Sequence, residues 1–193
     1  REITQVAHLP MPKIYIIPQR GANAFATGRN PEHAVVAVTE GILGLLSNEE
    51  LKGVLAHELG HVKNRDILIG SIAAAVAGAI MMLANMARWT AMFGGYSRDR
   101  DRNQGGGNII GLLAITILAP LAALIVQMAI SRNREYLADS TGAGFLHTGM
   151  PLANALQKLE TQSRHVPIEA SPQSAHMFIV NPLTGRSLMN LFS

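Results

Sequence analysis

Two long uncharged segments constrain the fold of this chain more than any other feature. Residues 67–87 and 109–130 contain no Asp, Glu, Lys or Arg. A helix rises roughly 1.5 Å per residue, so each segment is long enough as a helix to cross the hydrocarbon core of a bilayer, which is about 30 Å thick. The connector between them, residues 88–108, is polar, charged and rich in glycine. The pattern predicts a transmembrane helical hairpin. The alternative is a pair of buried core helices, but a core built from so short a chain rarely surrounds two helices of this kind.

The hairpin divides the chain into three successive parts. Residues 1–66 are expected to form a small sheet followed by a helix, residues 67–130 the hairpin, and residues 131–193 the rest of the domain that the hairpin interrupts. The expected architecture is therefore α+β, with a membrane hairpin inserted into one small domain.

Short runs of β-branched and aromatic residues predict three strands, at residues 13–18, 23–28 and 34–38. A helix is predicted over residues 47–66, because Ser47 and Glu50 have the spacing of a capping box and an apolar stripe follows.

After the hairpin, "SRNREYLADSTGAG", residues 131–144, is expected to continue the second apolar helix. Pro151 then begins an amphipathic helix, and the tail from Thr161 is expected to be irregular.

The composition excludes several kinds of function. Hydrophobic residues make up 48% of the chain and charged residues 15%, and the mean hydropathy is +0.20. The net charge of +3 is spread along the chain and only 5% of residues are aromatic, which argues against nucleic acid as a partner. Cysteine is absent, so the ligands of any transition metal must be His or carboxylate.

Basic residues flank both ends of the hairpin, so they do not set its orientation.

The stretch "VLAHELGHVKNRD", residues 54–66, carries the chemistry. His57 and His61 are four residues apart, so on a helix both imidazoles can take adjacent corners of one zinc coordination sphere. Zinc lowers the pKa of a bound water to about 7, and Glu58 is placed to act as general base while the resulting hydroxide attacks a scissile carbonyl. The alternative is two surface histidines on an ordinary helix.

A catalytic zinc site needs a third ligand. The other candidates are His8, His33, His147, His165, His176, Glu135, Asp139 and Glu160. Glu135 fits best, because a hairpin of two equal helices returns the chain to His61. Asp139 shares the helix face of Glu135 and could accept a hydrogen bond from the outer nitrogen of a ligating histidine. The alternative is charge pairing of both carboxylates with Arg132 and Arg134 on a solvated helix.

The motifs "NAFATG", "HELGHVKNRD" and "SRNREYLAD", in this order and with the hairpin before the last, resemble the HtpX family of membrane-bound zinc metalloproteases, in the M48 group of peptidases. The resemblance implies one zinc ion held by His57, His61 and Glu135. It implies Glu58 as the catalytic base and Asp139 as the support of a ligating histidine.

The same resemblance implies a place for the substrate. Asn23, Ala24, Phe25 and Ala26 would lie on an edge strand above the zinc, where an extended substrate adds a strand through main-chain hydrogen bonds. Without the resemblance, an ordinary sheet strand is the simpler reading. The implied activity is endoproteolysis of misfolded or damaged membrane proteins. The implied location is the lipid bilayer of the bacterial inner membrane, with several spans and the active site facing the cytoplasm.

The chain departs from the family pattern at both ends. The family has two further hydrophobic segments before the catalytic domain and a His-Pro-Pro stretch after the match to "SLMNLF", so we expect this chain, which begins at Arg1, to be a fragment. A catalytically impaired, zinc-stabilised membrane module is therefore one alternative, and a structural hairpin without metal is another. A prenyl-protein endoprotease of the same group is a third, although those relatives enclose a chamber that one hairpin cannot build.

Overall fold

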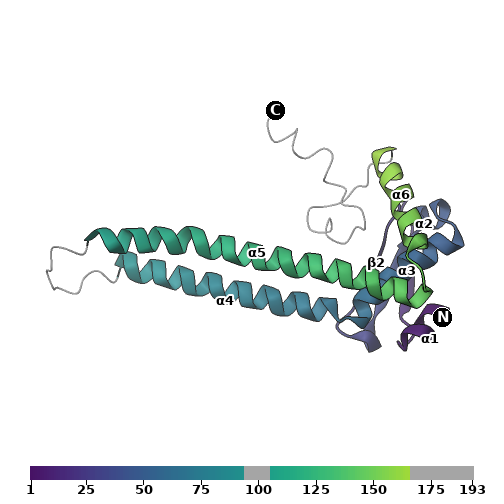
Figure 1. The fold of residues 1–193 in the computed structure, drawn as a ribbon, viewed down its shortest axis with the longest axis horizontal. Coiled ribbons are helices and arrows are strands. Elements are labelled where there is room, and N and C mark those ends of the chain that lie inside the picture. Colours follow the sequence, from purple (N-terminus) through teal and green to yellow (C-terminus); the bar gives the residue numbers. More distant parts are fainter. Residues whose placement is uncertain (94–104, 166–193) are drawn as a thin grey trace. The chain divides into compact units, whose positions relative to one another are not determined.

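The computed structural model describes residues 1–93 and 105–165 (Figure 1). The chain divides into two compact units. The sheet unit comprises residues 1–68 together with 134–193, and the hairpin unit comprises residues 69–133. The elements in chain order are α1 (Glu2–Ala7), β1 (Lys13–Ile17), β2 (Ala24–Thr27), a 3-10 turn (Pro31–His33), β3 (Val35–Thr39), α2 (Glu40–Leu45), α3 (Asn48–Lys63), α4 (Asp66–Phe93), α5 (Gly105–Leu146) and α6 (Met150–His165).

The three predicted strands form one sheet in the order β1-β3-β2. β1 runs parallel to β3 and β2 runs antiparallel to it, so β2 is an edge strand. The backbone N–H of Thr39 donates to the carbonyl of Asn23 at 2.9 Å. Because the direction of backbone groups alternates along a strand, this register turns the N–H and C=O of Ala24 and Ala26 towards the free edge.

Helix α3 packs between the sheet and α6. The buried cluster contains Val36 and Val38 from the sheet, Val54 and Leu59 from α3, and Leu159 from α6. The capping box of α3 is confirmed. The N–H of Ser47 donates to Oε2 of Glu50 at 2.8 Å, and the N–H of Glu50 donates to Oγ of Ser47 at 3.3 Å.

The predicted end of this helix at residue 66 is wrong. Helix α3 ends at Lys63, since Arg65 adopts a left-handed conformation with φ 56° that a right-handed helix cannot continue. Helix α4 then begins at Asp66.

Two glycines bring the C-terminal part of α5 close to α3. A Cβ added to Gly60 would lie 2.9 Å from the carbonyl oxygen of Ala138. A Cβ added to Gly142 would lie 2.9 Å from the backbone nitrogen of His57. The two helices are therefore in backbone contact along the part of α5 that follows residue 134.

The hairpin unit contains most of α4 and part of α5, and the large apolar side chains that the structure describes there are mostly exposed. The candidate spans are Asp66–Thr90, with mean hydropathy 2.4, and Thr116–Leu146, with mean hydropathy 1.3, and both are long and apolar enough to cross a bilayer. The described side chains buried in this unit include the alanines Ala77, Ala84 and Ala123. Exposure of the large apolar side chains is the reverse of what a pair of buried core helices would show.

Other boundaries differ from the predictions. The predicted connector, residues 88–108, is helical as far as Phe93 and again from Gly105, and the rest of it lies outside the described residues. Helix α6 continues through Thr161 to His165, where an irregular tail was predicted. The tail beyond His165 also lies outside the described residues.

Candidate metal centre

His57 and His61 project from the same side of α3 with their Nε2 atoms close together. The two Nε2 atoms are 3.1 Å apart, and the rings meet edge to face at 88°. The His57 side chain is 13% exposed and the His61 side chain 21%. Two imidazoles held this way present two lone pairs to one point.

Glu135 completes a group of three. Its Oε2 atom lies 3.7 Å from Nε2 of His57 and 3.7 Å from Nε2 of His61. Tetrahedral zinc with bonds of about 2.0–2.1 Å separates neighbouring ligand atoms by about 3.3–3.4 Å, so the three observed distances bracket the ideal edge. The Glu135 side chain is 59% exposed, so the centre is open on this side.

Among the residues whose side chains the structure describes, 1–90 and 116–163, this group is the one cluster of three such ligand atoms within 4.8 Å of one another. His8, His33, His147 and Glu160, which were also considered, do not belong to it. The side chains of His165 and His176 lie outside the described residues.

Each of the two imidazoles also has a carboxylate close to its Nδ1 atom. Nδ1 of His57 lies 2.8 Å from Oδ1 of Asp139, in a contact that does not meet the geometry of a hydrogen bond. Nδ1 of His61 lies 2.6 Å from Oδ2 of Asp66. Such contacts favour the tautomer that leaves Nε2 free to bind a metal.

Asp66 was missed by the sequence reasoning. On the continuous helix predicted over residues 47–66, it would lie about 140° around the axis from His61. The left-handed turn at Arg65 brings it back beside the ring. The signal that could have found Asp66 is its position at the end of the quoted motif, directly before the apolar run begins.

Glu58 lies at the junction of α3 and the edge strand. The backbone N–H of Ala26 donates to its Oε2 atom at 2.8 Å, and the residue is 7% exposed. Burial raises the pKa of Glu58 to about 7, against the opposing influence of His61 and of the hydrogen bond from Ala26. A carboxyl group in this state exchanges its proton near neutral pH.

The electrostatics of His57 suit a ligand. Burial is the main cause that lowers its pKa, and the neighbouring His61 lowers it further. Because the neutral imidazole is the form that binds metal, this shift favours ligation.

The four residues assigned to the substrate lie at β2. Ala24, Phe25 and Ala26 belong to the strand, and Asn23 directly precedes it. Asn23 is 4% exposed, and its backbone N–H donates to Oγ1 of Thr39 at 2.8 Å. Asn23 therefore anchors the strand, while the backbone groups of Ala24 and Ala26 face away from β3, with the N–H of Ala26 donating to Glu58.

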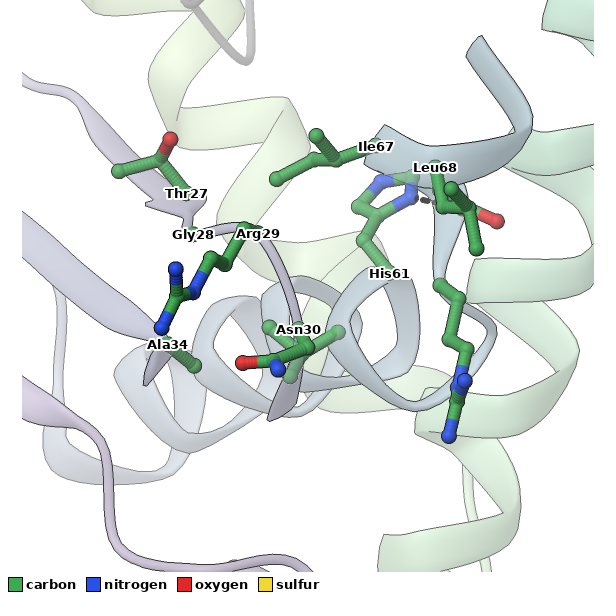
Figure 2. Close-up of a pocket in the computed structure, with 11 residues that line it drawn as sticks. Thr27, Gly28, Arg29, Asn30, Ala34, His61, Ile67 and Leu68 are labelled. Carbon is green, nitrogen blue, oxygen red and sulfur yellow. Dashed lines mark hydrogen bonds and ion pairs between the residues drawn. The ribbon is translucent and has the colours of Figure 1, made fainter. Parts of the chain in front are cut away.

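A small cavity adjoins the centre beyond the end of β2. Figure 2 shows His61 with Ile67 and Leu68 on one side, and Thr27, Gly28, Arg29 and Asn30 on the other. Ala34, Val62, Arg65 and Asp66 complete the lining.

Comparison with known proteins agrees with this geometry. The profile of peptidase family M48 matches residues 1–190. The whole chain aligns with proteins named Protease HtpX homolog from Desulforapulum autotrophicum, at 63% identity over 62% of the relative, and from Syntrophobacter fumaroxidans, at 60% identity over 68% of the relative. A third, from Thermococcus kodakarensis, is 57% identical over 66% of its length. The chain thus spans about two thirds of these relatives.

A solved structure shares the fold. Ste24p from S. mikatae superposes with a TM-score of 0.59 over 91% of this chain and 45% of that one, at 22% sequence identity. This likeness, together with the three-stranded sheet and the two apolar helices, confirms the predicted α+β fold of the zincin-like type. The profile match and the full-length similarity to HtpX relatives show that the chain belongs to peptidase family M48, in its HtpX branch.

Proposed function

We propose that this chain is the catalytic part of a zinc-dependent endopeptidase. The observation that carries the proposal is the convergence of three ligand atoms, from His57, His61 and Glu135, next to the buried carboxyl group of Glu58. These three residues would hold the zinc. When bound, zinc supplies a Lewis acid that polarises the scissile carbonyl and lowers the pKa of water.

Glu58 is the group that moves the proton. A carboxylate with a pKa near neutrality can accept a proton from the attacking water and later return it to the leaving amine. The hydrogen bond from the N–H of Ala26 fixes the orientation of the carboxylate during both steps. A nearby cation favours the ionised form, so Glu58 is prepared to act as a base when the centre is loaded.

The free edge of β2 supplies the binding surface for substrate. An extended peptide can add there as a further strand, because the register turns the backbone groups of Ala24 away from β3. Main-chain pairing requires little from the substrate's side chains. This suits a protease that acts on many unfolded segments.

The substrates that we propose are misfolded or damaged membrane proteins. Two described helices are long and apolar enough to cross a bilayer, and the first begins five residues after His61. A catalytic residue set this close in sequence to a span supports cleavage next to the membrane. We propose the bacterial inner membrane as the location, with the active site on the cytoplasmic side.

The test compares the detergent-solubilised parent with Glu58→Gln and His57→Ala. We expect one zinc per chain in the parent and in Glu58→Gln, and little in His57→Ala. Cleavage of unfolded casein and of a destabilised membrane protein should fall about 10²- to 10⁴-fold in Glu58→Gln, since only the proton acceptor is lost. Parent-like cleavage by Glu58→Gln would remove the general-base role, and a parent without zinc would overturn the metal centre.

A further inference from the structure

We infer that Asp66 is a positioning residue of the metal centre, which holds His61 through its side chain and the segment carrying Glu135 through its backbone. The inference rests on the proposed zinc site and extends it. Asp66 is the first residue of α4, and its side chain acts back on α3.

The contact between Asp66 and His61 is short, and Asp66 is buried. Oδ2 of Asp66 lies 2.6 Å from Nδ1 of His61, and Asp66 is 4% exposed. The carboxylate places the proton of the imidazole on Nδ1, which leaves the lone pair of Nε2 directed at His57 and Glu135. It also prevents rotation of the His61 ring.

The backbone conformation that makes this contact is unfavourable on its own. Arg65 has φ 56°, a left-handed conformation in which the Cβ of an L-residue lies too close to the following carbonyl oxygen. The neighbouring Asn64 is tied to α5, because its Nδ2 group donates to Oγ1 of Thr141 at 3.2 Å. The turn is thus held by contacts on either side of the strained residue.

Asp66 also contacts the residue that precedes Glu135. Nη1 of Arg134 donates to the backbone carbonyl of Asp66 at 3.0 Å, and Arg134 directly precedes Glu135. Asp66 therefore contacts His61 on α3 and also Arg134 on α5, next to Glu135. Asp139 supports His57 from a more exposed position, with 52% of its side chain open to solvent.

The competing explanation is that Asp66 only stabilises the start of α4. An acidic residue in the first turn of a helix interacts favourably with the helix dipole. That role would affect the folding stability and leave the metal affinity unchanged. Glu49 offers a matched control, because it lies in the first turn of α3 and its side chain is 73% exposed. It forms an ion pair with Lys52, away from the metal centre.

The experiment measures zinc dissociation constants by chelator competition for the full-length protein in detergent. The variants are Asp66→Ala, Asp66→Asn and Glu49→Gln. We expect Asp66→Ala to bind zinc about 10- to 100-fold more weakly than the parent, with an altered visible spectrum after Co²⁺ replaces zinc. Asp66→Asn should show a smaller loss, because its amide oxygen still accepts a hydrogen bond, and Glu49→Gln should match the parent.

Three outcomes would count against the inference. Parent-like zinc affinity and Co²⁺ spectrum in Asp66→Ala, with only a lower melting temperature, would assign Asp66 to the helix start. If Asp66→Ala does not fold, the test rests on Asp66→Asn. A zinc affinity and Co²⁺ spectrum in Asp66→Asn equal to those of the parent and of Glu49→Gln would also assign Asp66 to the helix start. A parent that binds no zinc would overturn the proposed function itself, so the two failures are distinguishable.

Discussion

Ionisation of the buried carboxyl group of Glu58 lowers the stability of the folded chain, so this effect depends on pH. Its pKa rises from 4.5 to about 7 in the folded chain because the carboxyl group is buried. The folded state therefore binds this proton more tightly than the unfolded state does. The stabilising contribution of the protonated form is complete below pH 4.5 and is lost as the pH rises through about 7.

Glu58→Gln should therefore stabilise the metal-free chain at pH 8 by about 1–3 kcal/mol, and by almost nothing at pH 4. The neutral amide avoids burial of a charge and can keep the hydrogen bond from Ala26. Denaturant unfolding of the chelated protein at both pH values measures the difference. An equal effect at pH 4 and pH 8 would show that burial of the charge is not its source.

Among single residues, the sequence was sufficient to predict which side chains a regular helix places on one face. His57 and His61 share a face because they are four residues apart, and the same holds for Glu135 and Asp139. The structure brings these two pairs to one centre. Asp66 could not be found in this way, because its place depends on one left-handed residue that the pattern of polar and apolar residues does not show.

At the level of elements, the centre depends on how closely α5 approaches α3. Gly142 faces the backbone of Ala56 and His57, and Ala138 faces Gly60 one turn earlier. Any side chain at Gly142 must push the helices apart by displacing backbone, since no flexible side chain is there to yield. Glu135 and Asp139 would move away from the histidines together.

Gly142→Ala should consequently weaken zinc binding at least 10-fold and lower the melting temperature. Gly144→Ala is the control on the same helix, because a Cβ there would meet nothing within 4 Å. Alanine is favoured over glycine in a helix by about 1 kcal/mol, so Gly144→Ala should leave zinc binding intact and raise the melting temperature slightly. Chelator competition and thermal unfolding of both variants test the helix contact, and equal zinc affinities would contradict it.

The predictable elements are those with a strong local signal. The capping box at Ser47 and the apolar periodicity predicted α3, and β-branched residues predicted the strands. Helices α1 and α2 have six residues each, too few to show a helical period. The start of α2 is capped by Thr39, whose Oγ1 accepts from the N–H of Ile42 at 3.3 Å, and in the sequence Thr39 directly follows the strand predicted at residues 34–38.

For the whole molecule, the inserted hairpin was predictable because uninterrupted apolar length is a property that short soluble helices do not have. The charges do not give its orientation: Lys63 and Arg65 lie before the first span, and Arg88 lies at its other end. The large side chains that the structure describes in the two candidate spans are mostly exposed, so an apolar surface of lipid or protein must cover them.

Insertion of the hairpin into a bilayer can be tested with one charge. Val76 lies near the middle of the first candidate span and is 51% exposed. Arginine at the centre of a membrane helix costs about 2.5–3.5 kcal/mol on insertion, so Val76→Arg should shift the protein from the carbonate-resistant membrane fraction to the soluble or aggregated fractions. Quantitative blotting of the three fractions gives the partition.

The control for that substitution is Leu43→Arg on α2 of the sheet unit. Leu43 is also exposed and apolar, at 38%, but it belongs to no candidate span. We expect this variant to remain in the membrane fraction like the parent, because it adds the same charge where no hydrocarbon surrounds it. If Val76→Arg partitions like Leu43→Arg, the first span does not cross the bilayer, and the exposed apolar face of α4 must be covered by protein instead.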